Sequence, residues 1–311
     1  MNYITIDSGT TNTRISIVSE NKVIDSLKFN VGARAGIKDN AVLKTAIRNG
    51  IDEILAKNNY SNADIERILA SGMITSEFGL CNLEHITTPV GLSELHNTSK
   101  EIILDEISEI PFVFIRGVKT NGTTFENTDM MRGEETELMG IISESHGECV
   151  YVFPGSHSKI IETDSTGKIS NFTTMLTGEM AFAISENTIL NASISLSNDE
   201  LNKEYLIKGY DYCNNVGINA ALFKTRVLKN LFSSTNSEVY SFYMGVILYG
   251  EVKYILNIKP NKVIISGQEK LKEAMNILLS EKSHCEIVSV SADIANTATA
   301  LGMVRIFEYS S

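Results

Sequence analysis

Residues 6–14 read Ile6-Asp7-Ser8-Gly9-Thr10-Thr11-Asn12-Thr13-Arg14. They join a short apolar run at residues 3–6 to a second run at residues 14–18, where polar and apolar side chains alternate with the period of a half-buried strand. A third such run covers residues 23–29. Consecutive strands with tight connections are typical of an antiparallel meander. We therefore expect the chain to open with a sheet of three strands joined by turns.

The chain then changes to alternating helices and strands. Apolar residues recur at helical spacing between Leu43 and Leu55, which predicts one buried helical face. Strands are expected over 68–70 and 112–115, and helices over 93–107 and 132–143. This alternation predicts an α/β sheet with crossover helices.

The opening pattern returns in the second half, with strands over 149–153, 159–163 and 169–175 and a helix from about residue 178. A helical block over 199–256 follows, and the remaining expected elements are a strand at 262–265, a helix at 269–279, a strand at 286–290 and a helix at 292–307. The repeat predicts a duplicated fold with a central cleft onto which both strand-joining turns would face. We expect one domain over 1–140, completed by a C-terminal helix at about 292–311, and another over 141–291.

Composition limits the class of protein. At 311 residues, 43% of them hydrophobic and 21% charged, the chain is long enough for two globular domains. Its 27 basic and 38 acidic residues give a net charge of −11, which argues against a general binder of nucleic acid or anionic membranes. The start lacks the pattern of a secretory signal, and the apolar run at 242–249 is too short to span a membrane. A cytoplasmic protein is expected.

The first turn is a candidate phosphate site. Gly9 lets backbone amides approach an anion closely, and the hydroxyls of Thr10 and Thr11 add donors. Asp7, two residues before the glycine, is placed to hold Mg²⁺ beside phosphates. The alternative is an ordinary β-turn in which Asp7 and Asn12 satisfy local amides.

Two later turns share this chemistry. The turn at 155–159 combines glycine, hydroxyls and a cation in Gly155, Ser156, His157, Ser158 and Lys159. The alternative reading makes His157 a partner of a loop carbonyl and Lys159 a solvated cation. A third turn, Ser266-Gly267, follows the strand at 262–265, and its glycine would let an adenosine ring lie against the backbone.

The order of these turns resembles the phosphate-1, phosphate-2 and adenosine motifs of the actin, hexokinase and Hsp70 superfamily. More narrowly, the chain is similar to the 2-keto-3-deoxygalactonokinase family. The segments that carry this resemblance are Ile6–Arg14, Ser71–Ser76, Met131–Gly140, Pro154–Lys159, Met175–Glu179 and Asn296–Ala298. The resemblance implies two ribonuclease-H-like (actin-like) domains, each a mixed five-stranded sheet flanked by helices.

The resemblance also implies an activity: ATP- and Mg²⁺-dependent transfer of the γ-phosphate to the terminal (C6) hydroxyl of 2-keto-3-deoxy-galactonate, in galactonate catabolism. It assigns the metal to Asp7. It assigns nucleotide and phosphate binding to Gly9, Thr10, Thr11, Asn12, Arg14, Gly155, Ser156, His157, Lys159, Ser266 and Gly267.

The same resemblance places the acceptor. Glu134 is the expected catalytic base, although first-turn acids also simply favour the helix dipole. Arg132 is the expected anchor for the substrate carboxylate, and its alternative is a surface arginine at a helix start. Ser76, Glu135 and Glu179 are further candidates for substrate binding. Alternatively, Ser76 only forms a turn, Glu135 supports Glu134 from behind, and Glu179 caps a helix.

Two other functions stay open at this point. One is a kinase for another sugar, sugar acid or pantothenate, because the chain differs from the common family pattern at Ser8, where tryptophan is frequent, and over Ser156–Ile160. The other is a non-kinase ATP switch of the Hsp70 or actin type. In every case the expected partners are small molecules, with no nucleic acid or membrane, and a homo-oligomer is compatible with the sequence.

Overall fold

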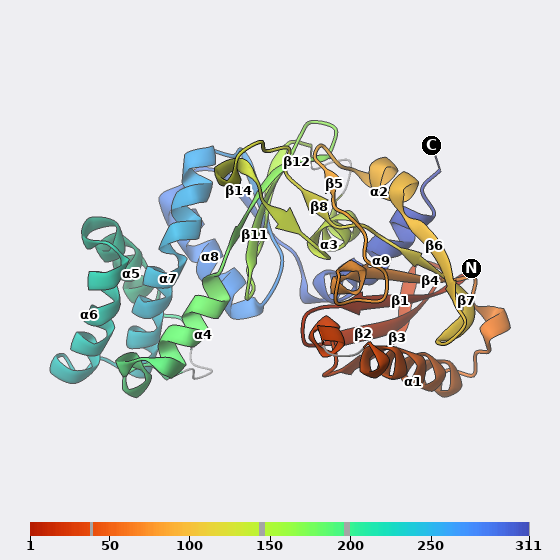
Figure 1. Ribbon diagram of the computed structural model, residues 1–311. Helices are drawn as coiled ribbons and strands as arrows, with labels where there is room; N and C mark the ends of the chain where they lie inside the picture. The colour runs from red at the N-terminus through yellow and green to blue at the C-terminus, as the bar shows by residue number, and fades with distance from the viewer. Residues whose placement is uncertain (38–39, 143–146, 196–199, 311) are drawn as a thin grey trace. The chain divides into compact units, whose positions relative to one another are not determined.

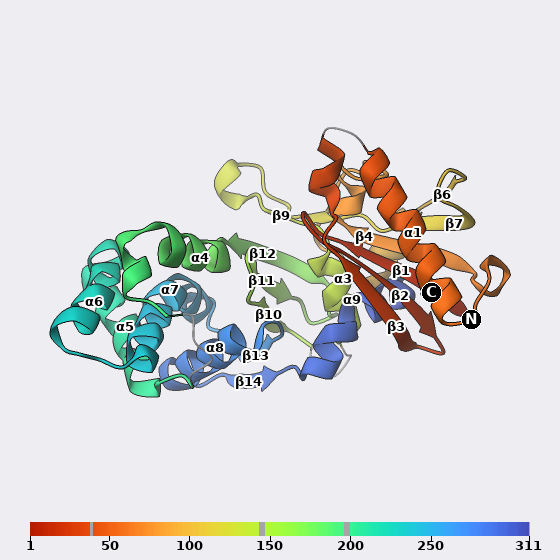
Figure 2. The same cartoon turned by 90° about the horizontal axis from the view of Figure 1, so that it is seen from below.

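The computed structural model describes residues 1–37, 40–142, 147–195 and 200–310. The chain folds into two compact units. The first unit comprises residues 1–147, 163–172 and 293–311, and the second comprises residues 148–162 and 173–292. Figures 1 and 2 show the elements from two directions.

The helices and strands agree closely with the predicted order. The first part of the chain contains β1 (Asn2–Ser8), β2 (Thr13–Ser19), β3 (Lys22–Phe29), α1 (Ala41–Lys57), β4 (Arg67–Gly72), β5 (Ile86–Thr87), α2 (Leu92–Thr98), β6 (Lys100–Leu104), β7 (Ser108–Phe114), β8 (Val118–Lys119), β9 (Met130–Met131) and α3 (Glu134–Ile141). The rest contains β10 (Cys149–Phe153), β11 (Ser158–Thr163), β12 (Ile169–Met175), α4 (Thr177–Asn187), α5 (Lys203–Val216), α6 (Ile218–Leu231), α7 (Asn236–Ile258), β13 (Lys262–Ile265), α8 (Glu269–Lys282), β14 (Glu286–Ser289) and α9 (Ala292–Phe307). Short 3₁₀ turns lie at η1 (Ala33–Ile37), η2 (Asn62–Asp64), η3 (Met73–Thr75), η4 (Phe125–Asn127) and η5 (Ile189–Ala192).

The main sheet of the first unit has the order β3-β2-β1-β4-β7-β6. Strand β1 pairs antiparallel with β2 and parallel with β4, so the sheet is mixed. Because side chains alternate along β1, Ile4 and Ile6 face one side and pack with Leu43 and Ile47 of α1. Tyr3 faces the other side, where its hydroxyl donates to Glu308 just after α9. Helix α1 therefore covers one face of this sheet, as Figure 1 shows, and α9 packs on the other.

The predicted α/β class with two mixed sheets is confirmed, but the first sheet departs from the expected five strands. Within the described residues it has a sixth strand, β6. The predicted helix over 93–107 is wrong for the same reason, because α2 ends at Thr98 and β6 follows directly. A small sheet of β5, β8 and β9, also unexpected, lies in the same unit.

The sheet of the second unit has the order β12-β11-β10-β13-β14. Strands β10, β13 and β14 pair in parallel, so their carboxyl ends lie at one edge. Val152, Ile160 and Ile265 on one face of the sheet share a buried core with α7 and α8. In chain order, this arrangement repeats the β3-β2-β1-β4-β7 order of the first unit.

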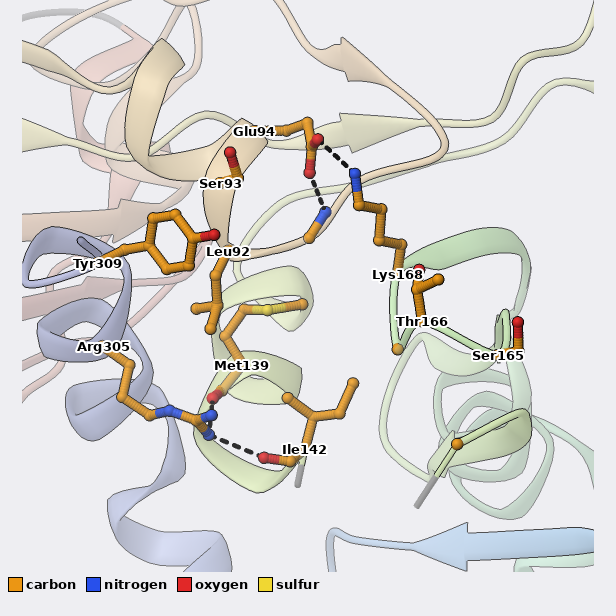
Figure 3. Close-up of a pocket in the computed structure, with 13 residues that line it drawn as sticks. Leu92, Ser93, Glu94, Met139, Ile142, Ser165, Thr166, Lys168, Arg305 and Tyr309 are labelled. Atoms are coloured by element: carbon orange, nitrogen blue, oxygen red, sulfur yellow. Dashed lines mark hydrogen bonds and ion pairs between the residues drawn. The ribbon is translucent and has the colours of Figure 1, made fainter. Parts of the chain in front are cut away.

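Helices α3 and α9 of the first unit lie very close together. A Cβ atom added to Gly140 of α3 would lie 1.9 Å from the carbonyl oxygen of Ala298, and one added to Gly302 of α9 would lie 1.9 Å from that of Thr136. Arg305 of α9 donates to the carbonyls of Met139 and Ile142 at 2.6 and 2.8 Å (Figure 3). Since the last carbonyls of a helix lack partners within it, this arginine caps the end of α3.

The turn between β11 and β12 also belongs to the first unit, which the expected domain boundaries at 140 and 291 did not include. Ile169 bridges to Val90, and Lys168 forms an ion pair with Glu94 at 2.6 Å. These contacts account for the assignment of residues 163–172. Figure 3 shows this pair beside a cavity of about 420 Å³ that Arg305 also lines. In the described part of the chain, no helix combines the length and hydropathy needed to span a bilayer.

Candidate functional site

The turn at residues 9–12 has backbone N–H groups without hydrogen-bond acceptors among the described residues. The Gly9 N–H donates to the Asn12 carbonyl at 2.9 Å, and the carbonyls of Gly9 and Thr10 accept from Ala33 and Arg34 at 3.0 and 2.9 Å. The amides of Thr10, Thr11 and Asn12 donate to no other described residue. Successive unpaired amides in a turn form a concave site for an anion.

A row of one acidic and two basic side chains crosses three strands beside this turn. Strand pairing places Asp7 opposite Arg14, and Arg14 opposite Lys28. All three line a cavity of about 210 Å³ together with the residues of the turn. Two cations directly opposite each other on neighbouring strands destabilise a sheet unless an anion lies nearby. This row therefore favours a site for negatively charged groups.

Charged side chains of both signs affect the pKa of Asp7. Burial raises its pKa, Arg14 and Lys28 oppose that rise, and Glu134 adds to it by repulsion. Asp7 and Glu134 thus lie close enough to repel each other, and their assignment to one site is untested. Gly133, which precedes Glu134, has a φ of 114° that suits glycine, and a Cβ atom added to it would lie 3.5 Å from the Cα of Gly72 at the end of β4.

Glu134 begins α3. Its carboxylate accepts a hydrogen bond from the Arg132 backbone N–H at 3.1 Å, which orients it at the helix N-terminus. Acidic side chains interact favourably with the dipole at this end of a helix. A carboxylate held in this way can accept a proton from a hydroxyl group, and its assignment as the base remains a prediction.

Glu135 is different, because it is fully buried. Both of its oxygens accept from the Gly133 N–H at 2.8 Å. Burial and the neighbouring Glu134 raise the pKa of Glu135 to about 8. In this structure the side chain braces the start of α3, and its predicted role in substrate binding is untested.

Arg132 holds the loop after β4. Its guanidinium donates to the carbonyl and hydroxyl of Thr75 at 2.8 and 2.7 Å and to the Leu83 carbonyl at 2.9 Å. Its Nε–H has no partner among the described residues. Ser76, in the same loop, donates to the Met73 carbonyl at 2.7 Å and is nearly buried. Both side chains thus have local structural partners, and their predicted roles in substrate binding are untested.

The turn at 154–158 lies at the carboxyl end of β10. The Gly155 carbonyl accepts from Gly178 at 3.0 Å, and the Ser156 carbonyl accepts from Glu179 at 3.2 Å. The first amides of α4 therefore hold the turn and are not open to a ligand. The amides of Ser156 and His157 donate to no described residue, so the turn itself offers the donors.

The side chains around this turn pair with each other. His157 Nε2 lies 3.1 Å from the Glu179 carboxylate, and both side chains are exposed. Lys159 is buried, and its ammonium group donates to Thr174 at 2.6 Å. The alternative reading of Lys159 as a solvated cation is therefore wrong, and the predicted phosphate contacts of these residues are untested.

The third predicted turn lies beside the second. Ser266 follows β13, and its N–H donates to the Val152 carbonyl at 3.0 Å. A Cβ atom added to Gly267 would lie 2.7 Å from the Pro154 carbonyl oxygen. Parallel pairing of β10 with β13 brings these two turns to the same edge of the sheet, a common place for ligands in open α/β sheets.

The comparisons with known proteins agree with these features. The family model described as 2-keto-3-deoxy-galactonokinase matches residues 7–306. The chain belongs to this family. The predicted resemblance is therefore confirmed, and with it the class of enzyme, a carbohydrate kinase.

Individual relatives give the same result. The chain is 25% identical over 253 residues to 2-dehydro-3-deoxygalactonokinase of Escherichia coli (strain K12), covering 80% of this chain and 79% of that protein. It is 26% identical over 196 residues to a probable 2-dehydro-3-deoxygalactonokinase of Rhizobium meliloti (strain 1021), covering 62% and 59%. A crystal structure of a Sinorhizobium meliloti protein bearing the same enzyme name has a TM-score of 0.78 at 21% identity, covering 98% and 97%, and shows the shared fold.

One residue that lines the cavity beside Asp7 was missed in the sequence. Lys28 lines the cavity beside Asp7, yet it stands outside every motif. Strand register explains the miss: the tight turn at Glu20 and Asn21 alone would place Leu27 opposite Arg14, and a register shift between Ile17 and Val18 places Lys28 there.

Proposed function

We propose that this chain transfers the γ-phosphate of ATP to the C6 hydroxyl of 2-keto-3-deoxy-galactonate, in galactonate catabolism. The observation that carries the proposal is the row of Asp7, Arg14 and Lys28 beside the unpaired amides of the turn at 9–12. Amides and cations suit phosphate oxygens, and a carboxylate suits the metal ion that accompanies them.

The nucleotide is proposed to engage three turns. Gly9, Thr10, Thr11 and Asn12 would donate to one phosphate group, and Arg14 would balance its charge. Gly155, Ser156, His157 and Lys159 would serve another phosphate group, and Ser266 and Gly267 would lie along the adenosine. The unbonded amides of the first two turns and the adjacency of the second and third support this assignment.

Mg²⁺ fits the donor set around Asp7. No group of three metal-ligating side chains occurs within the described ranges. Mg²⁺ commonly binds through one or two carboxylates, with phosphate oxygens and waters completing its octahedron. Asp7 supplies such a carboxylate, and the bound ion would offset the charge of the phosphates.

The acceptor is proposed to lie beside α3. Glu134 would accept the proton of the attacking hydroxyl, held in place by the Arg132 backbone N–H. The unpaired Nε–H of Arg132 would donate to the substrate carboxylate, while its other donors keep the loop of Ser76 in place. Glu179 and Ser76 would contact sugar hydroxyls, and Glu135 would support Glu134 from behind.

The proposal is tested by ATP consumption with 2-keto-3-deoxy-galactonate, its gluconate epimer and pantothenate as acceptors. The galactonate derivative should give the highest kcat/KM. Phosphorus–proton coupling in the NMR spectrum of the product should place the phosphate on C6, and the 6-deoxy analogue should not react. A preference for another acceptor would reassign the substrate. ATP turnover that no acceptor stimulates would instead favour a nucleotide switch.

A further inference from the structure

Glu251, in the middle of α7, is a buried carboxyl group that the proposed mechanism does not use. It is 1% exposed. Among the described residues, neither of its oxygens has a hydrogen-bond partner of full geometry. Its neighbours along the helix, Leu248, Val252 and Ile255, belong to the apolar core of the second unit. A carboxyl group in such surroundings destabilises the fold unless nearby polar groups interact with it.

Two hydroxyl groups provide that polar surrounding. Burial raises the pKa of Glu251, and the hydroxyls of Thr177 and Ser158 oppose the rise. Thr177 begins α4, and Ser158 begins β11 directly after the turn at 154–158. The carboxyl group therefore lies beside the last residue of the second phosphate turn and beside the first residue of α4.

The same two residues connect the turn to α4. Ser158 Oγ accepts from the Gly155 N–H at 3.2 Å and lies 3.3 Å from the Gly155 carbonyl oxygen. That carbonyl in turn accepts from Gly178, the residue after Thr177. Hydrogen bonds thus link Ser158 to Gly155 and Gly155 to Gly178, which directly follows Thr177, and the hydroxyls of Ser158 and Thr177 both lie beside the Glu251 carboxyl group.

The turn and the helix have no freedom to separate at this point without breaking these bonds. A Cβ atom added to Gly178 would lie 2.4 Å from the Gly155 carbonyl oxygen, so the backbones are in direct contact. The two bonds of Ser158 within the turn are long for hydroxyl bonds, so its proton can be shared with Glu251.

We propose that Glu251 is a positioning residue for nucleotide binding: through Ser158 and Thr177 it fixes the turn at 154–158 against α4 and keeps the Ser156 and His157 amides in place. The inference rests on the proposed role of this turn in binding phosphate. It does not depend on which sugar acid accepts the phosphate group.

Calorimetry measures the Kd of a non-hydrolysable ATP analogue in the presence of Mg²⁺. Steady-state kinetics measure kcat and the KM values for ATP and for the sugar acid. Glu251→Leu should raise the nucleotide Kd by about tenfold, because an apolar group replaces the carboxyl group that lies beside the hydroxyls of Ser158 and Thr177. The KM for the sugar acid should change less than about twofold. Glu251→Gln, whose amide can still donate and accept, should bring the Kd back to within about threefold of the wild type.

Ser241→Ala is the matched control. Ser241 is also buried on α7 and accepts from the Asn202 N–H, but it has no link to the turn. This variant should melt earlier than the wild type and bind the nucleotide equally well. If Glu251→Leu does not fold, Thr177→Val replaces it and should raise the nucleotide Kd by about threefold.

Two results overturn the proposal. The first is a Glu251→Leu variant with the wild-type nucleotide Kd, or, where that variant does not fold, a Thr177→Val variant with the wild-type Kd. The second is a Glu251→Gln variant that binds the nucleotide as poorly as Glu251→Leu. Because calorimetry needs no phosphoryl acceptor, the result stands even if the sugar acid is assigned wrongly. A wild-type protein that binds no nucleotide would sink the proposed function itself, and with it this role of Glu251.

Discussion

Glu134 and Asp7 illustrate how the fold gives similar side chains different tasks. Both are carboxylates and they repel each other, but Asp7 lies between cations whereas Glu134 lies at a helix start. The first suits a metal ion among phosphates, and the second suits proton transfer.

We expect Glu134→Gln to lower kcat by about 10²- to 10⁴-fold, the usual contribution of a general base. The Kd for nucleotide should remain within about threefold, since the amide keeps the size and helix position of the side chain. Glu137→Gln, on the same first turn of α3, is the control and should retain wild-type kcat. Steady-state kinetics and calorimetry measure both quantities, and a Glu134→Gln enzyme of normal kcat would assign the base elsewhere.

The burial of Glu135 leads to a prediction about how the stability of the protein depends on pH. Its pKa is about 8 in the folded chain, well above that of an unfolded glutamate near 4.3. The stability that the neutral form provides is therefore complete below about pH 4.3 and is lost as pH rises toward 8. Relative to Glu135→Gln, the wild type should lose at most about 1.4 kcal/mol of unfolding free energy per pH unit in this window, with no further loss well above pH 8.

Urea unfolding of both proteins at several pH values between 5 and 9 measures this difference. Parallel stability curves across that range would show that Glu135 is already ionised in the folded protein. The two hydrogen bonds from the Gly133 N–H would then be the dominant influence on its charge.

At the scale of single elements, the α3–α9 pair depends on glycine. Gly140→Ala or Gly302→Ala would place a methyl group against a carbonyl oxygen and push the helices apart. We expect each variant to lose about 1–3 kcal/mol of stability and to have reduced kcat, because α3 carries Glu134. Gly250→Ala on α7 is the control, since nothing lies within 4 Å of its added Cβ, and it should gain about 0.5–1 kcal/mol. Thermal unfolding with parallel assays distinguishes the two cases.

The sequence predicted elements well where the pattern was local. Strands 149–153, 169–175 and 262–265 and the helix at 292–307 were predicted with the bounds that the structure shows. Their apolar runs are bounded by clear turn residues. Periodicity alone was sufficient there.

The errors arose where a local pattern was ambiguous. The hydroxyls of Thr98 and Ser99 donate to the carbonyls of Glu94 and Leu95, which helps end α2 there. Residues 100–104 then pair with β7, and only that distant partner identifies them as a strand. The strands β5, β8 and β9 are two residues each and owe their existence to pairing far along the chain.

Local patterns also account for the parts of the candidate site that the sequence indicated. Its turns were recognisable because glycine and hydroxyl residues follow strands in a fixed order. Lys28 and Glu251 were not, because one depends on strand register and the other on which residue of an apolar helix meets the turn. Neither kind of information is present in a local motif.

At the scale of the whole molecule, one nucleotide is expected to protect both turns. The amides of residues 10–12 and of Ser156 and His157 lack partners among the described residues, so they should exchange hydrogen rapidly without ligand. A single equivalent of the Mg²⁺–ATP analogue should slow exchange at both turns together. Hydrogen exchange with mass spectrometry measures this, and protection of one turn alone would separate the other from nucleotide binding.

The close packing of α3 against α9 also has a consequence for folding during translation. Roughly 150 residues separate the two helices, so a ribosome working at about 5–20 residues per second reaches α9 roughly 8–30 s after α3. By the end of that interval the nascent chain carries Glu134 and both phosphate turns, but α9 is not yet present to pack against Gly140 of α3. Catalytic competence should therefore arrive late in translation, after the intervening unit has had time to fold.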